Sequence, residues 1–211
     1  MSHNALITRL NRTIAEGLPY RGTVLDLGCG DSPYRAEILA RADAYIGVDW
    51  PESPHGLGNV DVLASLAAPL PFRDAAADTI VAFQVLEHLP EPQAFLSECR
   101  RVLRPGGFLC LTVPFMWGVH EAPHDYFRFT RYGLTHLLRR SGFAQMQIRE
   151  NTGFWQTWVL KLNYHTARWL TPRTRFVLAP LWWIGQRLAP ALDRWDPHPE
   201  ETASYTVIAT R

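Results

Sequence analysis

The sequence predicts an α/β fold in which a mostly parallel sheet carries helices on both faces. Strand-like and helix-like segments alternate along most of the chain, as they do in β-α-β units. A short apolar run at residues 23–28 ends in glycines, which is typical of a central strand buried on both faces. The 211 residues suffice for one domain with an appendage.

The elements after the first strand can be placed in order. Pro33 suits the first turn of a helix, where its missing N–H needs no partner, so we expect a helix over residues 33–41. Apolar residues at helical spacing predict a second helix over residues 92–103, which Pro105 and two glycines end. Apolar, β-branched runs predict four further strands, at residues 44–49, 60–63, 79–83 and 108–113.

The last third of the chain predicts two more strands separated by a long excursion. A helix over residues 132–140 ends at Ser141 and Gly142, and residues 145–149 alternate as a strand does. The final nine residues are again β-branched and alternating. We therefore divide the chain into three parts: a core (residues 1–153), a tryptophan-rich helical insertion or lid (154–200) and a final strand of the core sheet (201–211).

The composition excludes several classes of protein. Hydrophobic residues make up 47% of the chain, charged residues 19%, and 14 glycines and 16 prolines are too few for a low-complexity chain. Lys and Arg (21) balance Asp and Glu (20) without a basic stripe, so we expect no nucleic-acid partner. The three cysteines lack the spacing of a disulfide framework, and no apolar leader opens the chain, so we expect a cytoplasmic protein.

The strongest motif is the turn after the first strand. Gly28 and Gly30 allow the backbone to approach a ligand closely, and the following helix offers unpaired N–H groups. Asp49 ends the second strand about 20 residues later, where a carboxylate can accept hydrogen bonds from ribose hydroxyls. Pro33 stands where a dinucleotide fingerprint has its third glycine, which disfavours a pyrophosphate ligand.

Six motifs in this order resemble class I S-adenosylmethionine-dependent methyltransferases, in particular the type 11 group. The resemblance covers about residues 20–150. It implies a Rossmann-like sheet of seven strands, mostly parallel with an antiparallel last strand, and S-adenosyl-L-methionine as cofactor. The motifs are VLDLGCG (24–30), YIGVD (45–49), LPFRD (70–74), DTIV (78–81), VLEHL (85–89) and LRPGG (103–107).

The resemblance assigns cofactor contacts by position. It places Asp26, Gly28 and Gly30 against the methionine and ribose portion, and Asp49 on the ribose hydroxyls. Trp50 is a candidate for stacking on adenine. The remaining implied contacts are the adenine edge, read by Asp61 and Val62, and the amino-acid end of the cofactor, faced by Phe83 and Gln84.

The methyl acceptor is expected to meet a loop that leaves the fifth strand at its carboxyl end, where α/β sheets bind ligands. Histidine is the default general base at neutral pH, so we expect His124 or His120 to take the acceptor proton, with Asp125 orienting it. The alternative for this loop is that Asp125 and Arg128 only tie it together through an ion pair. The expected substrate-binding residues are Tyr126, Arg128, Trp117 and His88.

His88 also belongs to a Glu-His pair similar to elements of some quinone-pathway O-methyltransferases, which lie beside the active site and can bind a divalent metal. Two adjacent ligands do not make a metal site, so we expect none. A packing role for His88 is the alternative.

Residues 154–195 hold six of the eight tryptophans and six basic side chains, but only one acid, Asp193. Two helices are expected here, with Trp155, Val159, Leu162, Thr166 and Trp169 on one face of the first. Aromatic residues beside basic ones suit the inner face of a membrane, and they also suit a lid, a homodimer surface or packing on the sheet.

These expectations combine into methyl transfer from S-adenosylmethionine to a hydroxyl or carboxyl oxygen of a small-molecule, sugar or lipid-linked acceptor. Gln84 and its successors stand where amino-methylating enzymes of DNA bases or glutamine carry an Asn-Pro-Pro-Tyr element, which disfavours that chemistry. The alternatives are an NAD-dependent oxidoreductase and a catalytically silent cofactor-binding scaffold that uses residues 154–195 as its contact surface.

Overall fold

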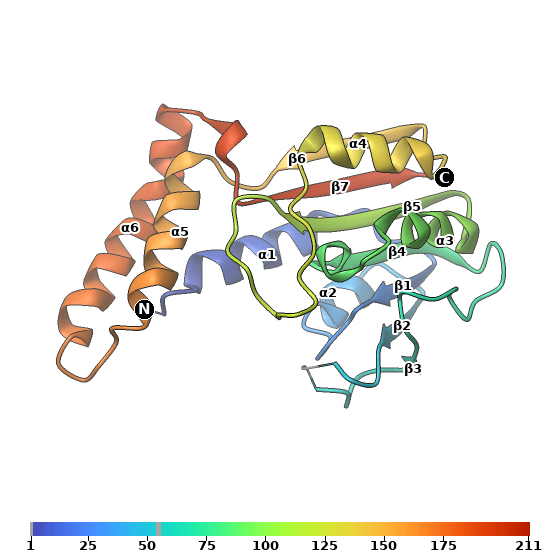
Figure 1. The fold of residues 1–211 in the computed structure, drawn as a ribbon, viewed down its shortest axis with the longest axis horizontal. Coiled ribbons are helices and arrows are strands. Elements are labelled where there is room, and N and C mark those ends of the chain that lie inside the picture. The colour runs from blue at the N-terminus through green and yellow to red at the C-terminus, as the bar shows by residue number, and fades with distance from the viewer. Residues whose placement is uncertain (1, 54–55) are drawn as a thin grey trace.

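A computed structural model describes residues 2–53 and 56–211 and shows one seven-stranded sheet in the order β3-β2-β1-β4-β5-β7-β6 (Figure 1). The first five strands in this order run parallel, and β7 is antiparallel to both of its neighbours. The predicted fold class is therefore confirmed. The strands are β1 (Thr23–Leu27), β2 (Ala44–Asp49), β3 (Val62–Leu63), β4 (Ala77–Phe83), β5 (Leu103–Pro114), β6 (Gln145–Glu150) and β7 (Ser204–Thr210).

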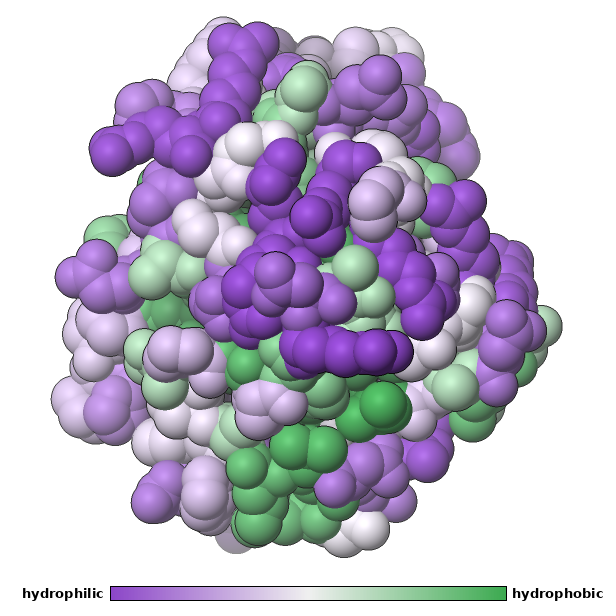
Figure 2. Space-filling view, turned by 90° about the vertical axis from the view of Figure 1, so that its right-hand side faces the viewer, coloured by the Kyte–Doolittle hydropathy of each residue, from purple (hydrophilic) through white to green (hydrophobic). Residues whose placement is uncertain are grey.

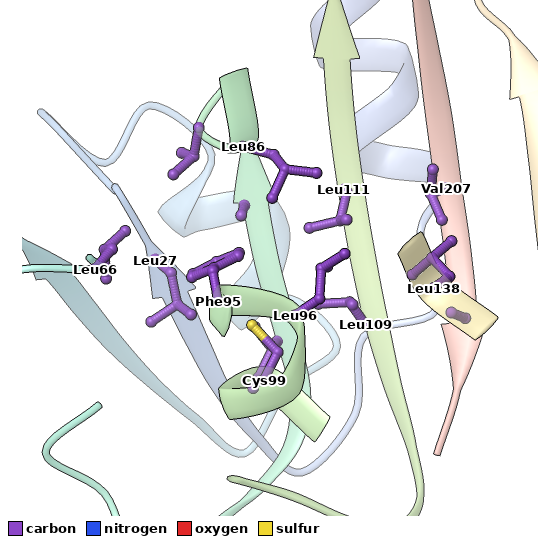
Figure 3. Packing of buried hydrophobic residues seen from close by; sticks show 14 of the residues in the cluster. Leu27, Leu66, Leu86, Phe95, Leu96, Cys99, Leu109, Leu111, Leu138 and Val207 are labelled. Atoms are coloured by element: carbon purple, nitrogen blue, oxygen red, sulfur yellow. The ribbon is translucent and has the colours of Figure 1, made fainter. Parts of the chain in front are cut away.

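Helices cover both faces of the sheet, as expected. The helices α3 (Pro92–Val102) and α4 (Arg131–Arg140) pack on one face, where Phe95 and Leu96 lie among side chains of β1, β4 and β5 (Figure 3). The smaller core on the other face contains Ile38 of α2 (Arg35–Leu39) and Leu18, which follows α1 (Ala5–Gly17). The sequence analysis did not predict α1, and α2 is shorter than expected.

The fifth strand begins earlier than predicted. Leu103 already pairs with Ala77, and the register then shifts so that Phe108 pairs with Thr79. The Pro-Gly-Gly segment between these two pairs is thus an irregularity within β5 rather than a loop before it. The Gly106 amide donates to the Arg211 carbonyl oxygen (2.9 Å), so the end of β7 supports this segment.

The insertion between β6 and β7 forms a helical hairpin at one end of the molecule, with α5 (Phe154–Ala167) beside α6 (Arg175–Trp195) and the short helix η2 (Pro199–Glu201) after it (Figure 1). The expected face of α5 is not uniform in burial, because Thr166 is buried whereas Leu162 and Trp169 are exposed. The other buried side chains of α5 are Thr157, Leu160 and Asn163.

Polar side chains can occupy this buried face because each has a hydrogen-bond partner. Thr157 binds the Thr152 hydroxyl (2.8 Å), and the Trp182 indole N–H donates to the Thr166 hydroxyl (2.9 Å). Apolar residues of α5 such as Trp158 and Leu162 are therefore exposed, which hydropathy alone does not predict.

Asp193 of α6 joins the two helices by capping the start of α5. Its carboxylate accepts hydrogen bonds from the backbone amides of Gly153, Trp155 and Gln156, at 2.8–3.2 Å, and from the Gln156 side chain. These amides belong to the first turn of α5 and have no partner inside the helix. The one acidic residue between residues 154 and 195 is therefore a structural cap.

We expect Asp193→Ala to lower the free energy of unfolding by about 1–3 kcal/mol, because several amides and one end of a helix dipole lose a charged acceptor. Urea denaturation followed by circular dichroism measures this change. Asp43→Ala, an exposed acid before β2, is the matched control and should change the stability by less than about 0.5 kcal/mol. Equal effects of the two variants would contradict the capping role.

Candidate active site

The site forms where the carboxyl ends of β1, β2, β4 and β5 meet. Gly28 and Gly30 have positive φ values (+76° and +50°), which glycine adopts without steric cost. A Cβ on Gly28 would lie 2.5 Å from a methyl group of Val85, so a side chain at this position would collide with the segment after β4. The turn after β1 is therefore restricted to glycine by its conformation and by its packing.

Asp49 links this turn to the end of β2. Its carboxylate accepts hydrogen bonds from the Gly30 amide (2.7 Å) and from the Trp50 amide (2.8 Å). Each carboxylate oxygen has two lone pairs, so both can still accept a further hydrogen bond. Asp49 is buried and lies in the wall of a cavity, where a diol could use that remaining capacity.

Two adjoining cavities open at this edge of the sheet, and Gly28, Phe83 and Gln84 line both of them. The larger encloses about 760 Å³ and the smaller about 300 Å³, within the range of cofactor-sized pockets. Gln84 has a positive φ (+55°) and is held by its amide donating to the Thr112 carbonyl oxygen (2.9 Å). Other walls of the larger cavity are formed by Asp49, Trp50, Leu66, Val85, His88, His124 and Tyr126.

Asp26 of β1 lines the smaller cavity and is almost fully buried. The Tyr45 hydroxyl donates to its carboxylate (2.8 Å). Burial raises the pKa of Asp26 to about 7, and the nearby Asp49 carboxylate adds to this rise. A cationic group bound in the smaller cavity would stabilise the ionised carboxylate, so this cavity suits the ammonium end of an amino acid.

Two expected cofactor residues do not reach either of these cavities. The Asp61 carboxylate accepts a hydrogen bond from the Gly47 amide (2.8 Å) and lies 3.5 Å from an Arg35 guanidinium nitrogen, so it fastens the segment before β3 to β2. Val62 lies in β3, directly after Asp61. The wall that we expected from these two residues is formed a few positions later, by Ser65, Leu66 and Ala67.

The lining of the two cavities fits S-adenosylmethionine in chemistry. Asp49 can accept from a ribose diol, Trp50 and Leu66 offer apolar surface for an aromatic base, and Asp26 offers an acid to an ammonium group. These contacts come from two adjoining cavities, which matches a cofactor with an aromatic base at one end and a zwitterion at the other.

The loop between β5 and α4 closes over the larger cavity and brings His124 and Tyr126 to its wall. The His124 ring meets the Trp50 ring edge-on, with 5.6 Å between the centroids, and its Nδ1 lies 3.4 Å from the Tyr126 hydroxyl. The backbone amides of Tyr126 and Phe127 donate to the Glu87 carbonyl oxygen and so hold the loop against the segment after β4. The structure thus places one of the two expected bases beside the expected cofactor region.

Asp125 and Arg128 serve the loop rather than a substrate. The side chain of Asp125 is 1% exposed and binds Arg128 through both oxygens, at 2.6 and 2.7 Å. This pairing holds the pKa of the Asp125 carboxyl well below its usual range. All five N–H groups of Arg128 are used inside the loop, by Asp125 and by the carbonyl oxygens of Trp117, Gly118 and Phe127.

Arg128 and Trp117, which we expected to bind substrate, line neither of the two cavities. Trp117 instead meets Tyr164 of α5 edge-on, with 5.0 Å between ring centroids. Asp125 accepts a hydrogen bond from the His120 amide (2.8 Å) and lies 3.5 Å from its ring. It is placed to orient His120, not His124.

A buried carboxylate, Glu87, lies beneath this loop. It is fully buried, and neither carboxylate oxygen has a hydrogen-bond partner among the described residues. His88 lies beside it, with its Nδ1 donating to the His124 carbonyl oxygen (2.7 Å) and its Nε2 lying 3.8 Å from Glu87. The ligand atoms of Glu87, His88 and His120 all lie within 4.8 Å of one another, an arrangement that could hold a divalent cation.

Sequence reasoning missed three contributions to the site. Asn11 and Ile14 of α1 line the smaller cavity, and their helix had been overlooked. Residues 65–67 line the larger cavity, and the register of the two-residue strand β3 determines which residues after it do so. The burial of Glu87 was also missed, because it depends on a loop some forty residues away and leaves no signal in the local sequence.

Burial raises the pKa of Glu87 to about 8, so the folded protein holds a proton there that the unfolded chain releases above pH 4.5. We therefore expect the free energy of unfolding to fall as the pH rises between about 5 and 8, and Glu87→Gln to remove that part of the fall. Urea denaturation at pH 6 and pH 9 with a metal chelator measures it. An identical pH dependence in the variant and the original protein would contradict this assignment.

Comparison with known proteins agrees with this geometry. Residues 25–111 match a family model described as a methyltransferase domain. A protein of Mycolicibacterium smegmatis that is named a probable S-adenosylmethionine-dependent methyltransferase is 38% identical over 133 residues, which cover 57% of this chain and 51% of that protein. The matched region spans only 35% of a second relative, from Mycobacterium tuberculosis, so the chain corresponds to about half or less of these relatives.

More distant matches cover more of the chain. A ubiquinone biosynthesis O-methyltransferase of Acinetobacter baumannii is 23% identical over 178 residues, which cover 71% of each protein. The crystal structure of an S-adenosylmethionine-dependent methyltransferase from Mesorhizobium loti has a TM-score of 0.61 at 17% identity and covers 98% of both chains, which shows the shared fold. The matched domain and these relatives identify residues 25–111 as a class I, type 11-like S-adenosylmethionine-dependent methyltransferase domain, and the sheet order and the β1 turn agree with it.

Proposed function

We propose that this protein transfers the methyl group of S-adenosylmethionine to an oxygen of a hydroxyl- or carboxyl-bearing small molecule, sugar or lipid-linked compound. The observation that carries the proposal is the presence of His124 and Asp49 in the wall of one cavity. One side chain can take a proton from an acceptor, and the other can bind a ribose diol. The Acinetobacter relative, named as an O-methyltransferase, supports an oxygen acceptor.

When bound, S-adenosylmethionine supplies a sulfonium-activated methyl group, which needs only an in-line nucleophile. Positioning therefore dominates the rate. Asp49 and the turn at Gly28 and Gly30 would fix the ribose, and Asp26 would bind the amino-acid end. Tyr126 would hold the acceptor against this cavity.

His124 would act as the general base. The imidazole would take the proton of the acceptor oxygen as that oxygen approaches the methyl group, which keeps the oxygen nucleophilic, and S-adenosylhomocysteine would be the leaving group. His124 is preferred to His120 because His124 lines the larger cavity, whereas the His120 ring faces His88, with 5.0 Å between centroids. His88 would support His124 through the hydrogen bond to its backbone carbonyl oxygen.

We expect the protein to bind S-adenosylmethionine and S-adenosylhomocysteine, but not NAD(H), in a calorimetric titration. Asp49→Ala should weaken cofactor affinity at least about 100-fold, because two hydrogen bonds to a charged group are lost. The matched control is Asp61→Ala, whose carboxylate binds the Gly47 amide, and it should change the affinity less than about threefold. Unchanged affinity in Asp49→Ala would contradict the ribose position, and binding of NAD(H) alone would overturn the proposed function.

We expect His124→Ala to lower kcat about 10²- to 10⁴-fold with little change in cofactor affinity, because a general base contributes a factor of this size. The assay follows S-adenosylhomocysteine release with an acceptor found by screening hydroxylated sugars and lipids. His136→Ala, an exposed histidine on α4, is the control. An unaltered kcat in His124→Ala together with a loss in His120→Ala would transfer the role to His120.

A further inference from the structure

Helix α6 carries an exposed apolar stripe that nothing in the described chain covers. Its members follow one another at intervals of four, three, four and seven residues, which keeps them on one face of a helix. Their exposed fractions run from 46% to 76%. The members of this outer stripe are Val177, Leu181, Ile184, Leu188 and Trp195.

The opposite face of α6 already has its partners. Trp182, Gln186 and Ala189 are buried there, and Gln186 donates to the Ser2 carbonyl oxygen (3.1 Å). Packing against the rest of the protein therefore accounts for one face of α6 and leaves the outer stripe without an explanation in the fold.

Further apolar side chains extend the exposed surface beyond the outer stripe. Phe176, at the start of α6, is 81% exposed, and Trp158, Trp169 and Leu170 are exposed on α5 and after it. The hairpin forms one end of the molecule (Figure 1), whereas the opposite end is largely hydrophilic, with its strongest apolar patch at the bottom of the view (Figure 2). Exposed apolar patches of this extent mark interaction surfaces.

The charge of the hairpin favours an anionic partner. Residues 151–192 contain five basic side chains and no acid. Three of these cations lie over exposed tryptophan rings at 5.0–5.4 Å from the ring centroids, and the pairs are Lys161 with Trp158, Arg168 with Trp169, and Arg187 with Trp183. Basic side chains beside indole rings match the headgroup region of an anionic bilayer, where the stems and rings lie in apolar surroundings and the cations meet phosphate.

A second copy of the chain fits this surface poorly. A two-fold interface brings the same patch of both subunits together, so the five basic side chains would face their own copies with no acid between them. An anionic bilayer has the opposite charge. None of the described helices has the length and hydropathy that spanning a bilayer requires. The hairpin would therefore contact the membrane with its helices parallel to the membrane surface.

We propose that the outer surface of the α5–α6 hairpin binds in the plane of an anionic membrane, with the outer stripe among the acyl chains and the arginines on lipid phosphates. Trp117 of the loop over the larger cavity contacts Tyr164 of α5, so this surface adjoins the substrate region. Membrane binding of this kind does not depend on the proposed reaction. It would bring a lipid-linked acceptor close to the cavity.

Sedimentation with vesicles tests the proposal on the full chain. We expect at least tenfold more binding to vesicles of equal parts phosphatidylcholine and phosphatidylglycerol than to phosphatidylcholine alone, with binding decreasing as salt rises. Leu181→Gln combined with Leu188→Gln, and separately Arg173→Glu combined with Arg175→Glu, should each reduce it about tenfold or more. Arg139→Glu combined with Arg140→Glu, exposed on α4, is the matched control and should stay within about twofold.

Three results would overturn the proposal. They are absence of binding to anionic vesicles, equal binding to both vesicle types, and a dimer in light scattering that Leu181→Gln with Leu188→Gln converts to monomer. Circular dichroism and calorimetric titration with S-adenosylhomocysteine check that each variant folds and retains its site. Because the cofactor titration is separate, failure of membrane binding is distinguishable from failure of the proposed function.

Discussion

The hydrogen bond from the Gly30 amide to the Asp49 carboxylate is the constraint on which the site depends. It joins the turn after β1 to the end of β2, two strands that pair in parallel along all of β1. The same carboxylate accepts from the Trp50 amide and lies in the larger cavity. The Asp49 side chain thus fixes one wall of the cavity and also offers lone pairs to a ligand. The geometry of this part of the site is therefore formed without a ligand.

The loop that lies over the larger cavity is held by a second set of polar contacts. Arg128 and Asp125 pair with each other inside the loop between β5 and α4, and the Glu87 backbone binds two amides of the same loop. A loop fixed in this way holds His124 and Tyr126 in the wall of the larger cavity. The cost of this arrangement is the burial of the Glu87 carboxyl group, which has no hydrogen-bond partner in the described part of the chain.

The sequence allowed the central strands and the glycine turn to be predicted because their signals are local. β1, β2 and β4 are continuous apolar runs, and Asp49 stands at the end of one of them. The outer contributions depend on contacts between distant segments. α1 is only partly apolar, and α5 buries Thr157 and Asn163, whose polarity is masked by hydrogen bonds to other segments.

The same limit applies to the site. The carboxylate of Asp61 could bind a ligand, but in the structure it accepts a hydrogen bond from a backbone amide of β2. This contact follows from the register of β3, which the sequence does not reveal. Arg128 looked available from its charge, whereas its geometry shows that every donor is used.

The position of β7 has a consequence for how the chain assembles. It follows β5 and β6 in sequence, yet it lies between them and supplies the only pairing of β6 among the described residues. Until β7 pairs, β5 presents an open edge and β6 has no partner strand in the described sheet. The sheet is therefore completed by pairing between segments that are far apart in sequence, which makes this step slow and leaves the open edge exposed to aggregation in the meantime.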